Sequence, residues 1–106
     1  MPRRRAERIR AKVVVPVGFV GAGTRFTADL VELSTYGLSV RTSHELDPGT
    51  VVRLGIKVGY EIFRAGAIVR SRQTGKGFAV EFLQMTPQDR ALLRRLYMRL
   101  AKPVGK

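Results

Sequence analysis

The 106-residue chain has no cysteine, only one histidine and no long apolar run. The absence of cysteine excludes disulfides and thiolate metal sites. The apolar runs are far shorter than a membrane-spanning helix, and the basic N-terminus lacks the apolar stretch of a secretory signal. At 44% hydrophobic residues, the chain is apolar enough to form a core. We therefore expect one small, soluble, cytoplasmic domain.

Acidic residues are also scarce, with 8 Asp and Glu against 20 Lys and Arg and a net charge of +12. Such an excess attracts anionic partners, but it does not distinguish nucleic acid, an anionic membrane, a nucleotide or an acidic protein. The basic side chains crowd the first twelve residues: Arg3, Arg4, Arg5, Arg8, Arg10 and Lys12. We expect residues 1–11 to form a flexible basic arm that binds a ligand.

Residues typical of catalysis or metal binding are few. His44 falls in a predicted loop, where a lone histidine is usually a solvent-exposed residue rather than a base or ligand. No His, Asp and Glu cluster has metal-ligand spacing, and no phosphate-binding glycine loop or nucleophile–base set is visible. We therefore expect no enzyme activity, no metal and no cofactor.

Alternating apolar residues predict six strands, over residues 12–20, 24–34, 38–42, 50–58, 61–71 and 77–82. The clearest alternation places four aliphatic residues on one face: Val52, Leu54, Ile56 and Val58. Pro16 cannot donate a ladder hydrogen bond, so its strand is predicted to be an edge strand or to contain a bulge. The apolar alternation shifts between Leu30 and Val31, which indicates either a bulge or burial on both faces.

A helix is predicted over residues 86–102. Thr86, Pro87 and Asp89 form a typical helix N-terminus, with a capping hydroxyl, a first-turn proline and an acidic residue at the capping-box position. Apolar residues then recur at helical spacing: Leu92, Leu93, Leu96, Tyr97 and Leu100. The whole pattern predicts an all-β domain with one helix. Specifically, residues 12–102 should form a six-stranded antiparallel β-barrel followed by a C-terminal α-helix.

Two short patterns are candidates for binding. Arg4 and Arg8 have RxxxR spacing in the basic arm, and Glu32, Ser34 and Gly37 precede a strand with acidic-x-Ser-x-x-Gly spacing. Taken alone, the first pattern is better explained by a solvated basic tail. The second, taken alone, is better explained by a tight turn, in which Gly37 permits a positive φ.

Taken in order, these pieces resemble a PilZ domain. The matching segments are RRAER at 4–8, ELSTYGLSV at 32–40, LDPG at 46–49, GFAVEF at 77–82 and the C-terminal amphipathic helix. The resemblance implies a six-stranded barrel that binds cyclic di-GMP (c-di-GMP) and has no catalysis of its own. It places the ligand-binding residues at Arg4, Arg5, Arg8, Glu32, Ser34 and Gly37.

One position departs from the family pattern, because Glu32 stands where the family has Asp or Asn. Glutamate keeps the charge and the acceptor oxygens but is one methylene longer, which shifts its carboxylate relative to a guanine edge. The resemblance implies a c-di-GMP receptor whose arginine arm becomes ordered on binding and signals to a protein partner, in motility or polysaccharide machinery. The alternatives are a degenerate adaptor that binds no nucleotide and, less favoured because no RNP pattern is present, a nucleic-acid-binding barrel.

Overall fold

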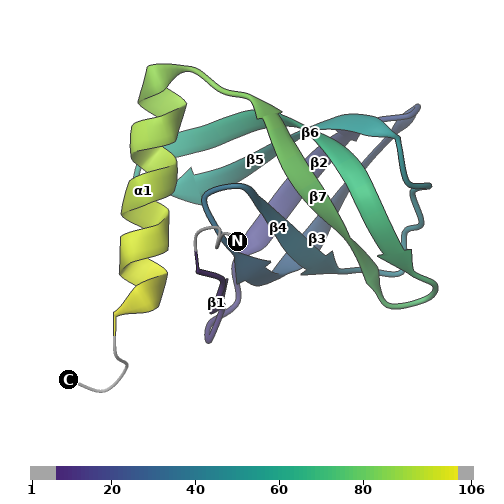
Figure 1. Cartoon of the computed structure of the whole chain (residues 1–106), viewed down its shortest axis with the longest axis horizontal. Helices are drawn as coiled ribbons and strands as arrows, with labels where there is room; N and C mark the ends of the chain where they lie inside the picture. The colour runs from purple at the N-terminus through teal and green to yellow at the C-terminus, as the bar shows by residue number, and fades with distance from the viewer. Residues whose placement is uncertain (1–6, 103–106) are drawn as a thin grey trace, which may run out of the picture.

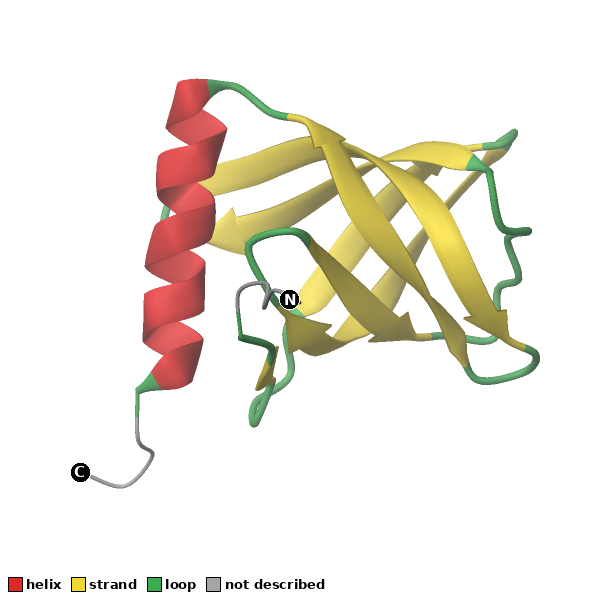
Figure 2. Cartoon of the chain, in the orientation of Figure 1, coloured by secondary structure: helices red, strands yellow, loops and turns green. Residues whose placement is uncertain are grey.

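Six antiparallel strands close into a barrel, and one helix stands across one end of it (Figure 1). The computed structural model describes residues 7–102. Neighbouring strands follow the order β3-β2-β5-β6-β7-β4, and β4 pairs back onto β3 to close the ring. The strands are β2 (Pro16–Gly21), β3 (Thr24–Leu33), β4 (Gly37–Arg41), β5 (Val51–Val58), β6 (Glu61–Gln73) and β7 (Gly77–Gln84). The predicted barrel with a C-terminal helix is confirmed, as Figure 2 also shows.

The barrel interior is filled by the alternate residues of every strand. In β5, the predicted face is confirmed, since Val52, Leu54, Ile56 and Val58 are all buried. Phe19 is also buried and packs its ring 5.3 Å from that of Phe26, centroid to centroid. Because closure leaves these six strands no free edge, the inward side chains form one continuous core.

A bulge in β3 determines which side chains reach the outer surface. Leu30 and Leu33 are both buried, and the register of β3 against β4 shifts between Leu30 and Glu32. The extra residue returns Leu33 to the core and leaves Glu32 partly exposed. Of the two interpretations left open by the sequence, the bulge is therefore correct.

The strand of Pro16 is neither an edge strand nor bulged, so the prediction made from this proline is wrong. Strand β2 lies between β3 and β5, and neither of its pairings contains a register shift. Pro16 is tolerated because it is the first residue of β2, and the pairing with β5 covers only Gly18, Phe19 and Val20.

A further short strand, β1 (Ile9–Arg10), lies within the segment predicted to be a flexible arm. It pairs with the end of β3, with Ile9 opposite Leu33 and Arg10 opposite Glu32. Ile9 packs against the core, which explains why the chain already joins the sheet here. Sequence reasoning ended the arm at residue 11, whereas in the structure the sheet begins at Ile9.

The helix α1 (Pro87–Ala101) begins as predicted. The Thr86 hydroxyl accepts a hydrogen bond from the Asp89 backbone N–H at 3.0 Å, and the Asp89 carboxylate accepts one from the Arg64 backbone N–H at 3.1 Å. Burial alone would raise the pKa of Asp89. Hydrogen bonds that its carboxylate accepts from Thr86 and from the Arg64 backbone, with the nearby Arg64 charge, together lower that pKa. The helix buries Leu92, Leu93 and Leu96. Within residues 7–102, no helix has the length and apolar character needed to cross a membrane.

Candidate functional site

The turn between β3 and β4 is held by the side chain of Ser34. Its Oγ accepts hydrogen bonds from the backbone N–H of Tyr36 at 3.0 Å and of Gly37 at 3.3 Å. The Ser34 backbone N–H donates to the Gly37 carbonyl at 2.9 Å. Ser34 is only 8% exposed, so these bonds are largely shielded from water. The turn is therefore a preformed structure that needs no ligand to define it.

Gly37 is required by close packing rather than by an unusual backbone angle. It is absent from the glycines with positive φ, so the conformational role expected from the sequence is wrong. A Cβ at this position would collide with the backbone carbonyl of Val80 in β7, which lies directly against the turn. Strand β7 is also tied to the turn by a bond from the Phe82 N–H to the Tyr36 carbonyl at 2.8 Å.

Glu32 lies between two arginines of the N-terminal segment. Its carboxylate is 3.8 Å from a guanidinium nitrogen of Arg8 and 3.6 Å from one of Arg10. The Glu32 side chain is 31% exposed, whereas those of Arg8 and Arg10 are 77% and 70% exposed. Both ion pairs are long and solvated, so each contributes little to stability.

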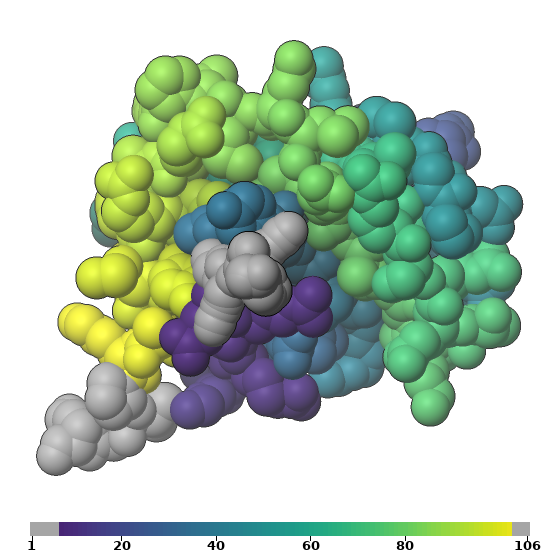
Figure 3. Space-filling model, in the orientation of Figure 1, coloured from purple at the N-terminus to yellow at the C-terminus, as the bar shows by residue number. Residues whose placement is uncertain are grey.

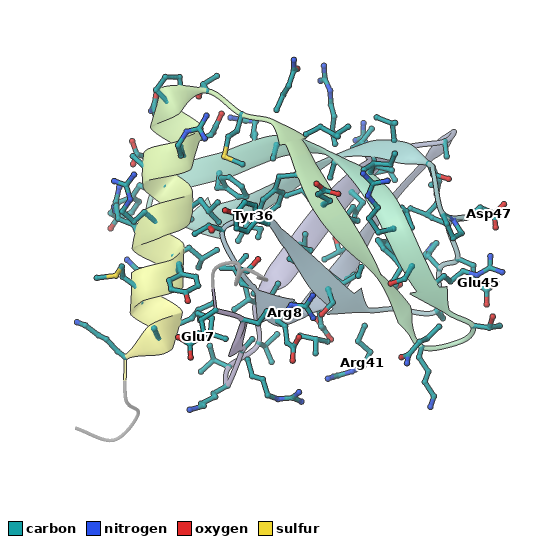
Figure 4. The ribbon with its side chains drawn as sticks, in the orientation of Figure 1. Glu7, Arg8, Tyr36, Arg41, Glu45 and Asp47 are labelled. Carbon is teal, nitrogen blue, oxygen red and sulfur yellow. The ribbon has the colours of Figure 1, made fainter. Side chains whose placement is uncertain are left out.

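Arg8 and Glu32 border a pocket of about 440 Å³ on the outer surface of the barrel. The Ser34–Gly37 turn forms part of its lining, and Arg70 of β6 and Glu81 of β7 contribute from the neighbouring strands. Figure 4 shows Arg8 in front of the barrel, with Tyr36 of the turn above it and Glu7 beside the helix. Figure 3 shows the first described residues packed beside the last turns of α1.

The helix holds the segment that carries Arg8. The Tyr97 hydroxyl donates a 2.7 Å hydrogen bond to the backbone carbonyl of Glu7, the residue before Arg8. Tyr97 and Ile9 both pack against the core cluster. The position of Arg8 therefore depends on β3 on one side and on α1 on the other.

Four of the predicted site residues come together around this pocket: Arg8, Glu32, Ser34 and Gly37. The other two, Arg4 and Arg5, lie outside the described residues. Sequence reasoning missed Arg10, Arg70 and Glu81. Arg70 Nε donates to Glu81 Oε1 at 2.7 Å, a pairing between strands that alternation along one strand does not reveal.

The family model of the PilZ domain matches residues 2–99. The chain belongs to the PilZ domain family. No curated protein matches the sequence. Two solved PilZ domains share its fold, each with 22% sequence identity. The PilZ domain of YcgR from Escherichia coli, solved with c-di-GMP, aligns with a TM-score of 0.77 over 93% of this chain and 92% of its own. The PilZ domain of CeSA from a cellulose-synthesizing bacterium aligns with a TM-score of 0.73 over 92% of this chain and 100% of its own.

The histidine of this PilZ domain lies away from the pocket. His44 is exposed in the loop before β5, and one face of its ring stacks on Phe26 with the ring centroids 4.2 Å apart. Among residues 7–102, no group of three or more His, Asp or Glu side chains is placed to hold a metal ion. The chemistry of the pocket therefore rests on guanidinium groups, carboxylates and the turn.

Proposed function

We propose that this PilZ domain is a c-di-GMP receptor that acts by binding rather than by catalysis. The observation that carries the proposal is the pocket that Arg8 and Glu32, which form an ion pair, line together with the Ser34–Gly37 turn. Membership of the PilZ family and the fold shared with a PilZ domain solved with c-di-GMP support it.

The arginines would recognise both parts of the ligand. A guanidinium group binds phosphate oxygens bidentately and also matches the O6 and N7 acceptors of guanine. Arg8 must first leave Glu32, and because that pair is exposed and 3.8 Å long, the exchange costs only about 0–1 kcal/mol. Arg4 and Arg5 would add further guanidinium groups, and the freed Glu32 carboxylate would accept from guanine N1–H and its amine.

Ser34 and Gly37 would act mainly by positioning. The Ser34 oxygen already accepts two backbone N–H groups, and its own O–H has an acceptor in the Gly37 carbonyl at 3.4 Å. Their task is to keep the β3–β4 turn and Glu32 fixed while the arm moves. Ligand binding would then order the arm against the barrel and change the surface offered to a protein partner in the cytoplasm.

Calorimetric titration with c-di-GMP at about 0.15 M salt tests the proposal. We expect saturable heat from the full chain, and replacement of both Arg4 and Arg8 by alanine should weaken binding by about 30-fold or more, since each bidentate contact is worth about 1–3 kcal/mol. Arg94→Ala with Arg99→Ala, two exposed helix residues outside the pocket, is the control with the same charge change. No heat from folded protein would refute the proposal.

The departure at Glu32 allows a second titration. Glu32→Asp restores the family residue and shortens the side chain by one methylene. We expect tighter binding, because the carboxylate then sits where the family pattern places it. Weaker binding would show that the longer side chain is suited to this pocket.

One observation favours a second candidate, an adaptor that binds no nucleotide. Glu32 already has two guanidinium partners, Arg8 and Arg10, so the pocket is partly neutralised without a ligand. This candidate predicts a folded domain that gives no heat with c-di-GMP, both as wild type and as Glu32→Asp. The two titrations together therefore separate the candidates.

A further inference from the structure

A larger groove, of about 1200 Å³, lies on the outer surface of the barrel and contains neither Arg8 nor Glu32. It crosses β2, β5, β6 and β7 and ends at the start of α1. Tyr36 borders both this groove and the candidate ligand pocket. The groove is therefore a separate feature of the same domain.

The floor of the groove is low because three outward positions are glycine: Gly18, Gly55 and Gly66. Gly18 and Gly55 face each other across β2 and β5. None of the three has a positive φ, and a Cβ at Gly66 would meet no atom within 4 Å. The fold itself therefore does not require glycine at Gly66, although glycine in a strand interior weakens the strand. Glycine in strands also occurs where another backbone approaches closely.

The walls of the groove are strongly cationic. Arg53 and Lys57 project outward from β5, and Arg90 lies on the first turn of α1. Within residues 7–102, none of these three side chains forms an ion pair. The acidic residue in the lining is Asp89, whose carboxylate already accepts from the Thr86 hydroxyl and the Arg64 backbone. The groove thus has uncompensated positive charge.

Apolar side chains also line the groove. Val20, Ile62 and Leu83 line the groove and are exposed by 47%, 41% and 50%. Binding of single-stranded nucleic acid uses several aromatic stacking platforms along a basic track. Of the aromatic residues that line this groove, Tyr36 is exposed at its border, and Phe82 packs its ring against Phe63. A concave surface that carries both cationic and aliphatic groups instead complements a peptide that carries both acidic and aliphatic residues.

We propose that this groove binds an extended acidic segment of a partner protein. Neighbouring strands lie about 4.8 Å apart, so four strands span roughly 15 Å, which is the length of about five extended residues. The acidic side chains pair with Arg53, Lys57 and Arg90, and the aliphatic ones cover Val20, Ile62 and Leu83. The peptide backbone lies over the glycine floor. This proposal does not depend on c-di-GMP binding, which uses a different set of charged residues.

Fluorescence anisotropy with the full chain and a fluorescein-labelled peptide, Leu-Glu-Glu-Val-Leu-Glu-Glu, tests the proposal. In an extended conformation this peptide carries acidic and aliphatic side chains on each face. At about 0.15 M salt we expect saturable binding that Arg53→Glu with Lys57→Glu weakens by at least about tenfold. The matched control, Arg94→Glu with Arg99→Glu, makes the same change in net charge on the outer face of α1 and should leave binding unchanged. An equal loss of peptide binding in both double variants would overturn the proposal, because it would show that the peptide is attracted to any basic surface.

A second variant fills the groove without changing charge. Gly66→Leu should reduce peptide binding by at least about tenfold while thermal unfolding stays cooperative, because its side chain occupies the floor. Ala91→Leu, on the exposed face of α1 outside the groove, is the control for added bulk. Unchanged peptide binding by Gly66→Leu, no peptide binding by wild type, or tighter binding of a single-stranded oligonucleotide of equal charge would each overturn the proposal. Calorimetry with c-di-GMP on the same variants reports separately on the other pocket.

Discussion

The β3–β4 turn and the N-terminal segment form two sides of the same pocket, yet they are held in different ways. The turn is fixed by shielded hydrogen bonds to Ser34 and by close packing of Gly37 against β7. The arginines of the N-terminal segment are held by long ion pairs at exposed side chains. One side of the pocket is therefore preformed, whereas the guanidinium groups of the other side can exchange partners at little energetic cost.

The largest expected effect is on the turn side. Gly37→Ala places a Cβ against the Val80 carbonyl, so β4 and β7 must separate locally. We expect the free energy of unfolding, measured with urea, to fall by about 3 kcal/mol. Gly66→Ala is the matched control, because its Cβ meets no atom within 4 Å. Similar losses in the free energy of unfolding for Gly37→Ala and Gly66→Ala would show that the turn is not tightly packed.

Ser34→Ala should have the next largest effect. It removes the acceptor of the Tyr36 and Gly37 N–H groups at a site that is 8% exposed. Leaving shielded donors unsatisfied should lower the free energy of unfolding by about 2 kcal/mol. Ser43→Ala, in an exposed loop position, serves as the control in the same urea titration. A loss no larger than that of the control would mean that the turn forms without its side-chain acceptor.

Tyr97→Phe tests the contact between the helix and the N-terminal segment. It removes only the hydroxyl that donates to the Glu7 carbonyl. We expect a loss of about 0.5–1 kcal/mol in stability. Amide exchange should also become faster at Arg8 and Ile9, with no change at Tyr36 and Gly37. Faster exchange at both places would show that the two sides are not independent.

Arg10→Ala should have the smallest effect on stability. Its pair with Glu32 is 3.6 Å long and its side chain is 70% exposed. The free energy of unfolding should therefore fall by less than about 0.5 kcal/mol. The measurement is the same urea titration. A loss as large as that of Ser34→Ala would contradict the view that the arginine side of the pocket is weakly held.

Features encoded by neighbouring residues could be predicted from the sequence. The alternation of β5 and the Thr86 cap of α1 depend on residues within one turn or strand, and both are confirmed. Features that depend on distant parts of the chain could not. The alternation shift at Leu30 did not by itself distinguish a bulge from burial on two faces, because the difference is the register against β4. Strand β1 was missed because Ile9 is a lone apolar residue among charges, and its partner Leu33 is far along the chain.

The candidate site shows the same division. Arg8 and the residues of the β3–β4 turn have the spacings that the resemblance to the PilZ family points to, and the structure brings them to one pocket. Arg70 and Glu81 were missed because their place beside that pocket follows from the pairing of β6 with β7. The reason for Gly37 was also wrong, since the collision that excludes a side chain comes from Val80 in another strand.

Amide hydrogen exchange with and without saturating c-di-GMP shows directly whether the two sides of the pocket respond differently to the ligand. If the turn is preformed and the arginine segment is completed by the ligand, then c-di-GMP should slow exchange at Arg8, Ile9 and Arg10 much more than at Tyr36 and Gly37. The Arg4→Ala with Arg8→Ala variant should lose this protection. Unchanged exchange in the N-terminal segment, or equal protection on both sides of the pocket, would show that the ligand does not complete a preformed turn with a movable arginine segment.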